Sequence, residues 1–120
     1  MDTPYVIERR KRVESTQDIA RTLAESSGGN VLVTADEQVA GRGRSGNPWW
    51  QADSNLFMSL AFRPRWPVAT WGRIPLVVGG VVADAIDEVL EVAVGLKWPN
   101  DILIDTNKVG GVLVEARDGV

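Results

Sequence analysis

Residues 94–116 read VGLKWPNDILIDTNKVGGVLVEA, and their pattern is the strongest indication of the fold class. Three runs in this stretch, residues 94–98, 102–104 and 109–116, are rich in β-branched and other apolar residues, which favour β-strands. The second and third runs are separated by the polar residues 105–108, which is typical of a hairpin turn. The stretch therefore predicts three strands, of which the last two form a hairpin.

The preceding residues predict two helices and further strands. The sequence STQD at residues 15–18 resembles a capping box, and apolar residues follow it at helical spacing until Gly28. Strands are expected at residues 31–35, where the run is β-branched, and at residues 56–62, where side chains alternate between two faces. Residues 76–90 predict a long core helix, with a glycine pair that allows close packing. The side chains expected on its buried face are Leu76, Val77, Val81, Ala85, Val89 and Leu90. Helices and strands in this mixed order indicate an α+β (or α/β) domain with a mixed sheet.

Composition restricts the chemistry of the 120-residue chain. A net charge of -3 argues against a protein that holds nucleic acid by bulk charge neutralisation. The chain has no cysteine and no histidine, which excludes thiolate sites and histidine-based catalysis and leaves lysine, arginine and carboxylates. The lack of cysteine suits a reducing cytoplasm. No signal peptide and no membrane span are expected, because no apolar run approaches about 18 residues.

The sequence GRGRSG at residues 41–46 is the clearest candidate for a binding loop. Glycines expose backbone N–H groups, and each arginine has a planar guanidinium group that can bind two oxygens, so such a loop can bind a phosphate or a carboxylate. A solvated surface loop or a nucleic-acid contact would explain the same pattern equally well. Gln38 before the loop and the pair Trp49-Trp50 after it add a polar amide and a flat apolar wall, although Trp49 could equally serve core packing.

Two further segments combine charge with special backbone residues. KWPND at residues 97–101 brings a cation, an aromatic ring, a proline turn and a carboxylate together, although an ordinary strand exit would look similar. KVGGVLVE at residues 108–115 has a lysine at the start of a strand and glycines inside it. Such glycines indicate either the close approach of a ligand or a β-bulge.

The order of these motifs resembles the biotin-protein ligase family from about residue 13 to residue 115. The resemblance implies the catalytic fold that biotin and lipoate ligases share with class II aminoacyl-tRNA synthetases. It also implies a reaction in which ATP, with Mg²⁺, activates biotin to biotinyl-5′-AMP. The biotin would then pass to a lysine of a biotin carboxyl carrier protein. A homodimer would be compatible with the family, and the sequence leaves the oligomeric state open.

The resemblance assigns roles to individual residues. Arg42 would hold the adenylate phosphate, Gly41 and Gly43 would let the loop close, Arg44 would support the closed form, and Trp49 would wall the nucleotide side. The residues expected to contact biotin are Ser15, Thr16 and Gln38, near its ureido ring or carboxylate region, and Gly111 and Leu113, along its cavity.

The remaining roles fall on the last third of the chain. Lys108 would reach the biotin carboxylate and the α-phosphate, and with Arg42 and Asp101 it forms the expected catalytic set. Asn100 and Asp101 would lie near Mg²⁺ or the incoming lysine, with Asp101 as the metal ligand, and Lys97 is a further binding candidate.

Three departures from the family pattern bear on function. Gln17 stands where the family often has asparagine. Only a short strand fits before residue 15, so a DNA-binding helix-turn-helix and a repressor function are not expected. The chain stops soon after residue 115, so residues 1–120 are expected to form a truncated catalytic domain without its C-terminal part or the small C-terminal domain. The alternatives are a lipoate-type acyl-adenylating ligase and a non-catalytic fragment that binds biotin or nucleotide.

Overall fold

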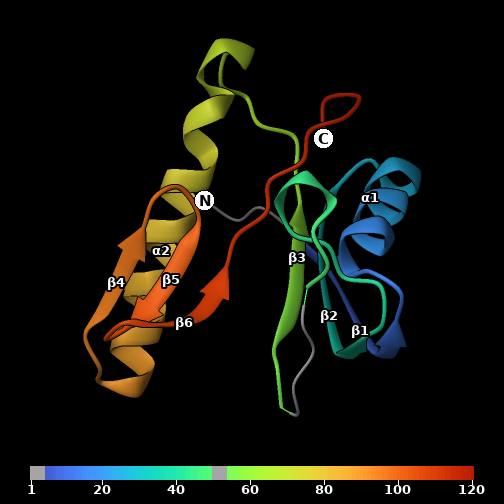
Figure 1. Ribbon diagram of the computed structural model, residues 1–120. Helices are drawn as coiled ribbons and strands as arrows, with labels where there is room; N and C mark the ends of the chain where they lie inside the picture. The colour runs from blue at the N-terminus through green and yellow to red at the C-terminus, as the bar shows by residue number, and fades with distance from the viewer. Residues whose placement is uncertain (1–4, 50–53) are drawn as a thin grey trace. The chain divides into compact units, whose positions relative to one another are not determined.

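The computed structural model describes residues 5–49 and 54–120, so Trp50 lies outside the described residues. The chain divides into two compact units (Figure 1). Unit 1 comprises Met1–Pro64 together with Ala116–Val120, and unit 2 comprises Arg65–Glu115. Among the described residues, no helix is long and apolar enough to cross a membrane.

Unit 1 is a mixed three-stranded sheet with one helix. Its strands are β1 (Tyr5–Val13), β2 (Asn30–Gln38) and β3 (Phe57–Ala61), in the order β1-β2-β3. Strand β2 pairs parallel to β1 and antiparallel to β3. Helix α1 (Thr16–Ser27) is the crossover between the two parallel strands. This arrangement places the end of β1 beside the end of β2, where Val13 pairs with Gln38.

The core of unit 1 lies between α1 and the sheet. Ala20 and Ala24 of α1 pack against Val31 and Val33 of β2 and Ala61 of β3. Alanines on the helix leave room for the branched strand residues, so the two elements approach closely. A second cluster contains Val13, Ala35 and Phe57.

Strand β3 confirms the expected alternation. Phe57, Ser59 and Ala61 are buried, whereas Met58 and Leu60, the larger apolar pair, face outward and are half exposed. The buried face therefore includes one polar residue, Ser59.

The ends of α1 show one confirmed prediction and one that was wrong. Gly28 adopts the left-handed conformation (φ 70°), and its N–H donates to the carbonyl of Ala24 at 2.9 Å, which ends the helix as predicted. Ser15 occupies the N-cap position, but no side-chain cap hydrogen bond forms, so the capping-box prediction was wrong. The hydroxyl of Ser15 and the carboxylate of Asp18 instead accept hydrogen bonds from Arg42.

Unit 2 contains a helix and an antiparallel sheet. A short 3-10 segment, η2 (Val68–Arg73), leads into helix α2 (Ile74–Leu90). Strands β4 (Val94–Lys97), β5 (Asp101–Ile104) and β6 (Asn107–Gly111) follow in the sheet order β4-β5-β6. The predicted hairpin is confirmed, but its turn is shorter than expected, and β6 ends at Gly111.

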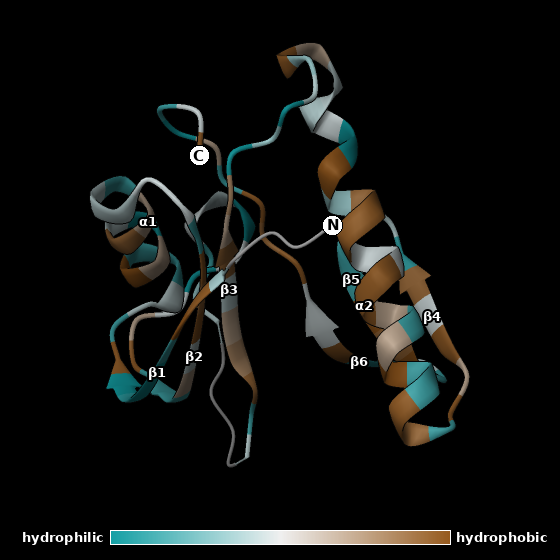
Figure 2. Ribbon diagram, turned by 180° about the vertical axis from the view of Figure 1, so that it is seen from behind, coloured by the Kyte–Doolittle hydropathy of each residue, from teal (hydrophilic) through white to brown (hydrophobic). Residues whose placement is uncertain are grey.

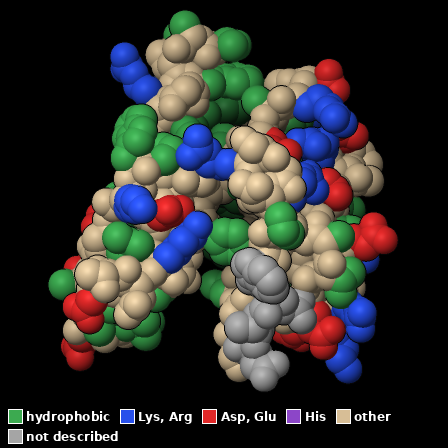
Figure 3. Space-filling view, viewed as in Figure 1, with side chains coloured by type: hydrophobic (Ala, Val, Ile, Leu, Met, Phe, Trp, Pro, Cys, Tyr) green, Lys and Arg blue, Asp and Glu red, His purple; other side chains and the backbone are tan. Residues whose placement is uncertain are grey.

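Helix α2 contradicts the prediction for its buried face. Its buried residues are Ile74, Gly79 and Ala83. The side chains expected in the core are instead exposed: Leu76, Val77, Val81, Ala85, Val89 and Leu90. The helix is apolar around most of its circumference, so the sequence did not single out the strip that meets β4 (Figure 2). Figure 3 shows hydrophobic side chains in several places on the face of the molecule that it draws.

The α+β fold class is confirmed. Unit 1 has the expected mixed sheet, and unit 2 adds a separate antiparallel one.

Candidate active site

The first candidate cluster lies where β1 runs into α1 and where β2 ends. The backbone N–H of Thr16 donates to Gln38 Oε1 at 2.8 Å, and the Thr16 hydroxyl lies 3.1 Å from the same oxygen. Ser15 and Thr16 are buried, with 3% and 4% exposure. The carboxyl ends of parallel strands are where ligands commonly bind in sheets with crossover helices. Three of the residues expected to contact biotin are therefore neighbours in unit 1.

Ser59 and Gln17 extend this cluster. The Ser59 hydroxyl donates to Gln17 Oε1 at 2.6 Å and lies 2.7 Å from Thr16 Oγ1. Ser59 is 6% exposed. Among the described residues, every buried side-chain nitrogen or oxygen has a hydrogen-bond partner. Sequence reasoning did not assign Ser59 a role, although the alternation of β3 placed a serine on the same face as Phe57 and Ala61.

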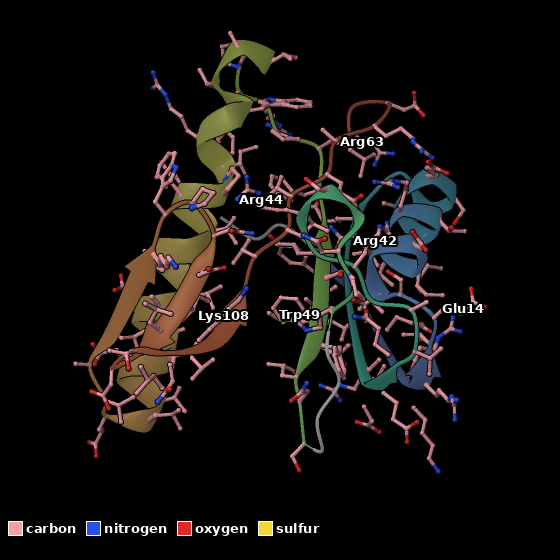
Figure 4. The ribbon with its side chains drawn as sticks, in the orientation of Figure 1. Glu14, Arg42, Arg44, Trp49, Arg63 and Lys108 are labelled. Atoms are coloured by element: carbon pink, nitrogen blue, oxygen red, sulfur yellow. The ribbon has the colours of Figure 1, made fainter. Side chains whose placement is uncertain are left out.

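Arg42 is held against the first turn of α1 (Figure 4). Its guanidinium donates to the two carboxylate oxygens of Asp18 at 2.9 and 3.3 Å, and to the Ser15 hydroxyl at 3.3 Å. The forked contact with Asp18 is the geometry in which arginine also binds phosphate. Arg42 thus reaches the Ser15–Thr16 corner from a loop 24 residues beyond Asp18.

A side chain at Gly41 would require the Gln38 amide to move. A Cβ added there would come closer to Gln38 Nε2 than real atoms approach, and it would lie 3.2 Å from the Cβ of Trp49. A Cβ at Gly43 would make only ordinary contacts, the nearest at 3.5 Å. Glycine at position 41 therefore leaves the Gln38 amide where it hydrogen-bonds to Thr16, a reason that the sequence did not reveal.

The loop after Gly41 is a tight, ordered turn. The N–H of Trp49 donates to the carbonyl of Gly41 at 3.0 Å, and Arg42 forms a β-bridge with Pro48. A short 3-10 segment, η1 (Arg44–Gly46), closes the turn, with positive φ angles at Ser45 (58°) and Gly46 (73°).

Trp49 and Arg44 differ in their surroundings. Trp49 packs against the cluster of Val13, Ala35 and Phe57, so it has at least the core role that the sequence left open. Arg44 is exposed, and the structure brings its side chain into none of the polar clusters described for unit 1.

The second candidate cluster belongs to the β5–β6 hairpin of unit 2. Lys108 Nζ lies 2.9 Å from Asp101 Oδ1, with side-chain exposures of 47% and 24% (Figure 4). The two residues come from adjacent strands, since Leu103 pairs with Lys108 and Asp101 with Gly111. Among residues 5–49 and 54–120, no group of three or more acidic side chains could hold a metal ion. Asp101 instead forms an ion pair with Lys108.

Asn100 forms hydrogen bonds with the backbone just beyond β6. Its Nδ2 donates to the carbonyl of Val112 at 3.0 Å, and the N–H of Val112 donates to the carbonyl of Asn100 at 3.0 Å. These two hydrogen bonds hold the backbone at Val112, between Gly111 and Leu113, which are both partly buried. Lys97, at the end of β4, is exposed.

The glycines of β6 accompany a β-bulge. Ile102 pairs with Gly110 and Leu103 with Lys108, which leaves Val109 as an extra residue on β6. A Cβ at Gly110 would lie 3.6 Å from Ile102 Cδ1, an ordinary contact. The structural explanation that the sequence offered for this glycine pair is therefore present.

Comparison with known proteins identifies the family of the chain. The family model described as "Biotin/lipoate A/B protein ligase family" matches residues 10–120. The chain belongs to this family. The resemblance to biotin-protein ligases that the four motifs indicated is confirmed.

Members of the biotin/lipoate ligase family with known names and structures resemble the chain closely. The "Bifunctional ligase/repressor BirA" of Bacillus subtilis is 38% identical over 107 residues, which cover 88% of this chain and 33% of that protein. A structure of the Leishmania major biotin protein ligase in complex with biotinyl-5-AMP matches 97% of this chain and 54% of that chain, with a TM-score of 0.86 and 34% identity.

A biotin protein ligase from Aquifex aeolicus in complex with biotin and ATP matches 95% of this chain and 48% of that chain, with a TM-score of 0.77 and 35% identity. The chain thus spans about half of these solved relatives and a third of the B. subtilis protein.

Proposed function

We propose that the protein activates biotin with ATP to biotinyl-5′-AMP and transfers the biotin to a lysine of a biotin carboxyl carrier protein. The observation that carries the proposal is the cluster in which Gln38 and Arg42 both converge on Ser15 and Thr16. Relatives named as ligases, and solved relatives that bind biotin, ATP or biotinyl-5-AMP, support the same activity.

Ser15, Thr16 and Gln38 are proposed to recognise the polar end of biotin. Buried hydroxyl and amide groups hold a ligand in one orientation, because an unpaired polar group in such a site costs binding energy. Gly41 would allow the Gln38 amide to keep its position beside Thr16, because glycine leaves space for it. Gly111 and Leu113 are proposed to line the apolar part of the ligand, on a backbone that Asn100 holds in place.

Arg42 is proposed to bind the adenylate phosphate. The attack of a carboxylate on the α-phosphorus of ATP brings anions together, so fixed cations supply the main stabilisation. The guanidinium already binds a carboxylate, that of Asp18, in a forked contact, and a phosphate offers the same pair of oxygens. Arg44, Gly43 and Trp49 are proposed to shape the loop over the nucleotide and to limit the access of water.

Lys108 is proposed as the second cation, acting on the biotin carboxylate and the α-phosphate. Its ion pair with Asp101 would hold the ammonium in place before substrates bind. Magnesium would enter with ATP. Asp101 would supply one carboxylate to an ion that takes most of its ligands from phosphate and water. Lys97 is proposed to add positive charge near the same substrate.

The test is to titrate biotin into the protein and then to supply ATP and Mg²⁺. We expect biotin to bind, biotinyl-5′-AMP to appear by mass spectrometry, and a carboxyl carrier domain to acquire biotin. Because the family includes lipoate ligases, lipoate is the matched control substrate. Formation of lipoyl-AMP in place of biotinyl-AMP would assign the chain to the lipoate branch, and biotin binding without AMP chemistry would identify a binding fragment. Because the chain has no cysteine, we propose that the reaction takes place in the cytoplasm.

A further inference from the structure

The β-bulge in β6 lies directly beside Lys108, and the activity proposed above gives it no role. We propose that the bulge residue, Val109, is a positioning residue that places Lys108 on the same face of the sheet as Asp101 and Gly111. The inference rests on the proposed function, in which Lys108 and Gly111 contact the same ligand.

The two faces of the β4-β5-β6 sheet differ, because α2 lies against one of them (Figures 1 and 2). Ile102 is 2% exposed, and its partner Leu96 lies close to α2, since a Cβ added to Gly79 would be 3.8 Å from Leu96 Cδ2. Successive residues of a strand point to opposite faces, so Asp101 lies on the face away from α2, here called the outer face. Gly111 pairs with Asp101 and therefore shares the outer face.

An uninterrupted strand would not place Lys108 on the outer face. Lys108 and Gly111 are three positions apart, and strict alternation puts such residues on opposite faces. If Gly111 kept its partner, a regular ladder would pair Lys108 with Ile104 and turn its side chain toward α2. In the structure Lys108 pairs with Leu103 instead, because Val109 is an extra residue on β6.

Hydrogen bonds on both sides of the bulge hold the strands in register. Beyond β6, the N–H of Val112 donates to the carbonyl of Asn100, and Asn100 Nδ2 donates to the carbonyl of Val112, both at 3.0 Å. A carbonyl can only accept, so this contact fixes the orientation of the Asn100 amide. On the other side, Ile104 pairs with Asn107 across a two-residue turn. The extra residue is therefore taken up between these pairs, at Val109.

The ion pair with Asp101 follows from this placement. Leu103, the partner of Lys108, is two positions from Asp101, so the two charged side chains are diagonal neighbours on the outer face. Their charged atoms are 2.9 Å apart. Lys97 pairs with Asp101 from β4 and shares the same face. Two cations and the bare backbone of Gly111 thus lie on one face, which suits a ligand with an anionic end and an apolar body.

Two changes of one residue each would remove the bulge with opposite results. Deleting Val109 gives a regular ladder in which Lys108 still pairs with Leu103 on the outer face. Inserting an alanine between Ile102 and Leu103 also gives a regular ladder, because β5 then has as many residues as β6. In the insertion variant, however, Leu103 and its partner Lys108 turn toward α2. Comparing the two variants therefore separates loss of the bulge from reorientation of the lysine.

The orientation of the side chain is measured with a single cysteine, because the chain has none of its own. Lys108→Cys is introduced into the parental chain, the deletion variant and the insertion variant, and its reaction with a maleimide is timed. We expect the reaction to be at least about tenfold slower in the insertion variant, because a cysteine that faces α2 is shielded from the reagent. Lys97→Cys, the control on β4, should react at one rate in all three backgrounds.

The rate of biotinyl-5′-AMP formation should follow the same pattern. We expect the deletion variant to stay within about threefold of the parental rate and the insertion variant to be about a hundredfold slower, the scale of one lost electrostatic donor. In the insertion variant residue 109 faces outward, so adding Val109→Lys should recover most of the rate. If a lysine facing α2 prevents folding, Lys108→Val is added to the insertion variant, and the comparison with and without Val109→Lys is repeated.

Fast labelling of Lys108→Cys in the insertion variant would overturn the inference, because the bulge would then not determine the face. Equal losses of rate in the deletion and insertion variants, or no recovery with Val109→Lys, would show that the face of the lysine does not matter. If labelling follows the expected pattern but even the parental chain forms no biotinyl-5′-AMP, the proposed function fails while the placement of Lys108 stands.

Discussion

Replacing Arg42 by methionine removes the guanidinium but keeps an unbranched side chain at the start of the loop. The same ion pair can be broken from its other side by Asp18→Asn, which leaves the arginine charge in place. The two variants should therefore have similar stabilities, but only Arg42→Met should weaken retention of the ligand, because only it removes the cation proposed to hold the adenylate phosphate.

The structure sets the expected stability loss. The side chains of Arg42 and Asp18 are 29% and 57% exposed, so solvent weakens their attraction. An exposed pair of this kind contributes up to about 1 kcal/mol to the free energy of unfolding. We expect each variant to lose about that amount or less, measured by urea denaturation.

The expected effect on the ligand is larger. A phosphate that loses a charge-assisted hydrogen-bond partner loses about 1.5 to 3 kcal/mol, so biotinyl-5′-AMP should leave Arg42→Met about tenfold to a hundredfold faster. From Asp18→Asn it should leave no faster than from the parental chain, because the competing carboxylate is neutralised. Stopped-flow dissociation of synthetic biotinyl-5′-AMP measures both rates. Unchanged release from Arg42→Met, or equal acceleration in the two variants, would refute the role of Arg42.

Two further predictions concern Gly41 and the lysine of unit 2. Gly41→Ala should displace the Gln38 amide and weaken biotin binding about tenfold by calorimetry, whereas Gly29→Ala, where an added Cβ lies 3.9 Å from its nearest neighbour, should not. Lys108→Met should slow biotinyl-5′-AMP formation about a hundredfold in rapid-quench experiments, the scale of one lost electrostatic donor. Asp101→Asn breaks the same ion pair but keeps the lysine, so equal rates in these two variants would show that the pair is only structural.

Local patterns in the sequence predicted several elements because their causes are local. The end of α1 at Gly28, the alternation of β3 and the hairpin of β5 and β6 depend on residues that are neighbours along the chain. The mixed order of helices and strands gave the fold class for the same reason.

The errors arose where distant residues decide the outcome. Ser15 and Asp18 have the spacing of a capping box, but Arg42 binds both from another part of the chain. The helix α2 is apolar on most sides, so its pattern could not identify the strip covered by β4.

The sequence indicated several residues of the candidate site but not the hydrogen bonds that join them. The motifs pointed to Gln38 and Arg42 as polar residues suited to a ligand, and the family resemblance added Thr16. The contacts of Ser59 with Thr16 and Gln17 join residues 43 and 42 positions apart, a pairing that no local pattern contains. The crowding around Gly41 likewise depends on where the Gln38 amide lies.

The proposal that the chain activates biotin is best tested by the exchange of labelled pyrophosphate into ATP. The exchange is measured on this chain and on a form extended at its C-terminus to the length of its relatives, with biotin, with lipoate and with neither. We predict exchange in the extended form that requires biotin and that lipoate does not support. Exchange that lipoate supports equally well, or no biotin-dependent exchange in either form, would contradict the proposed activity.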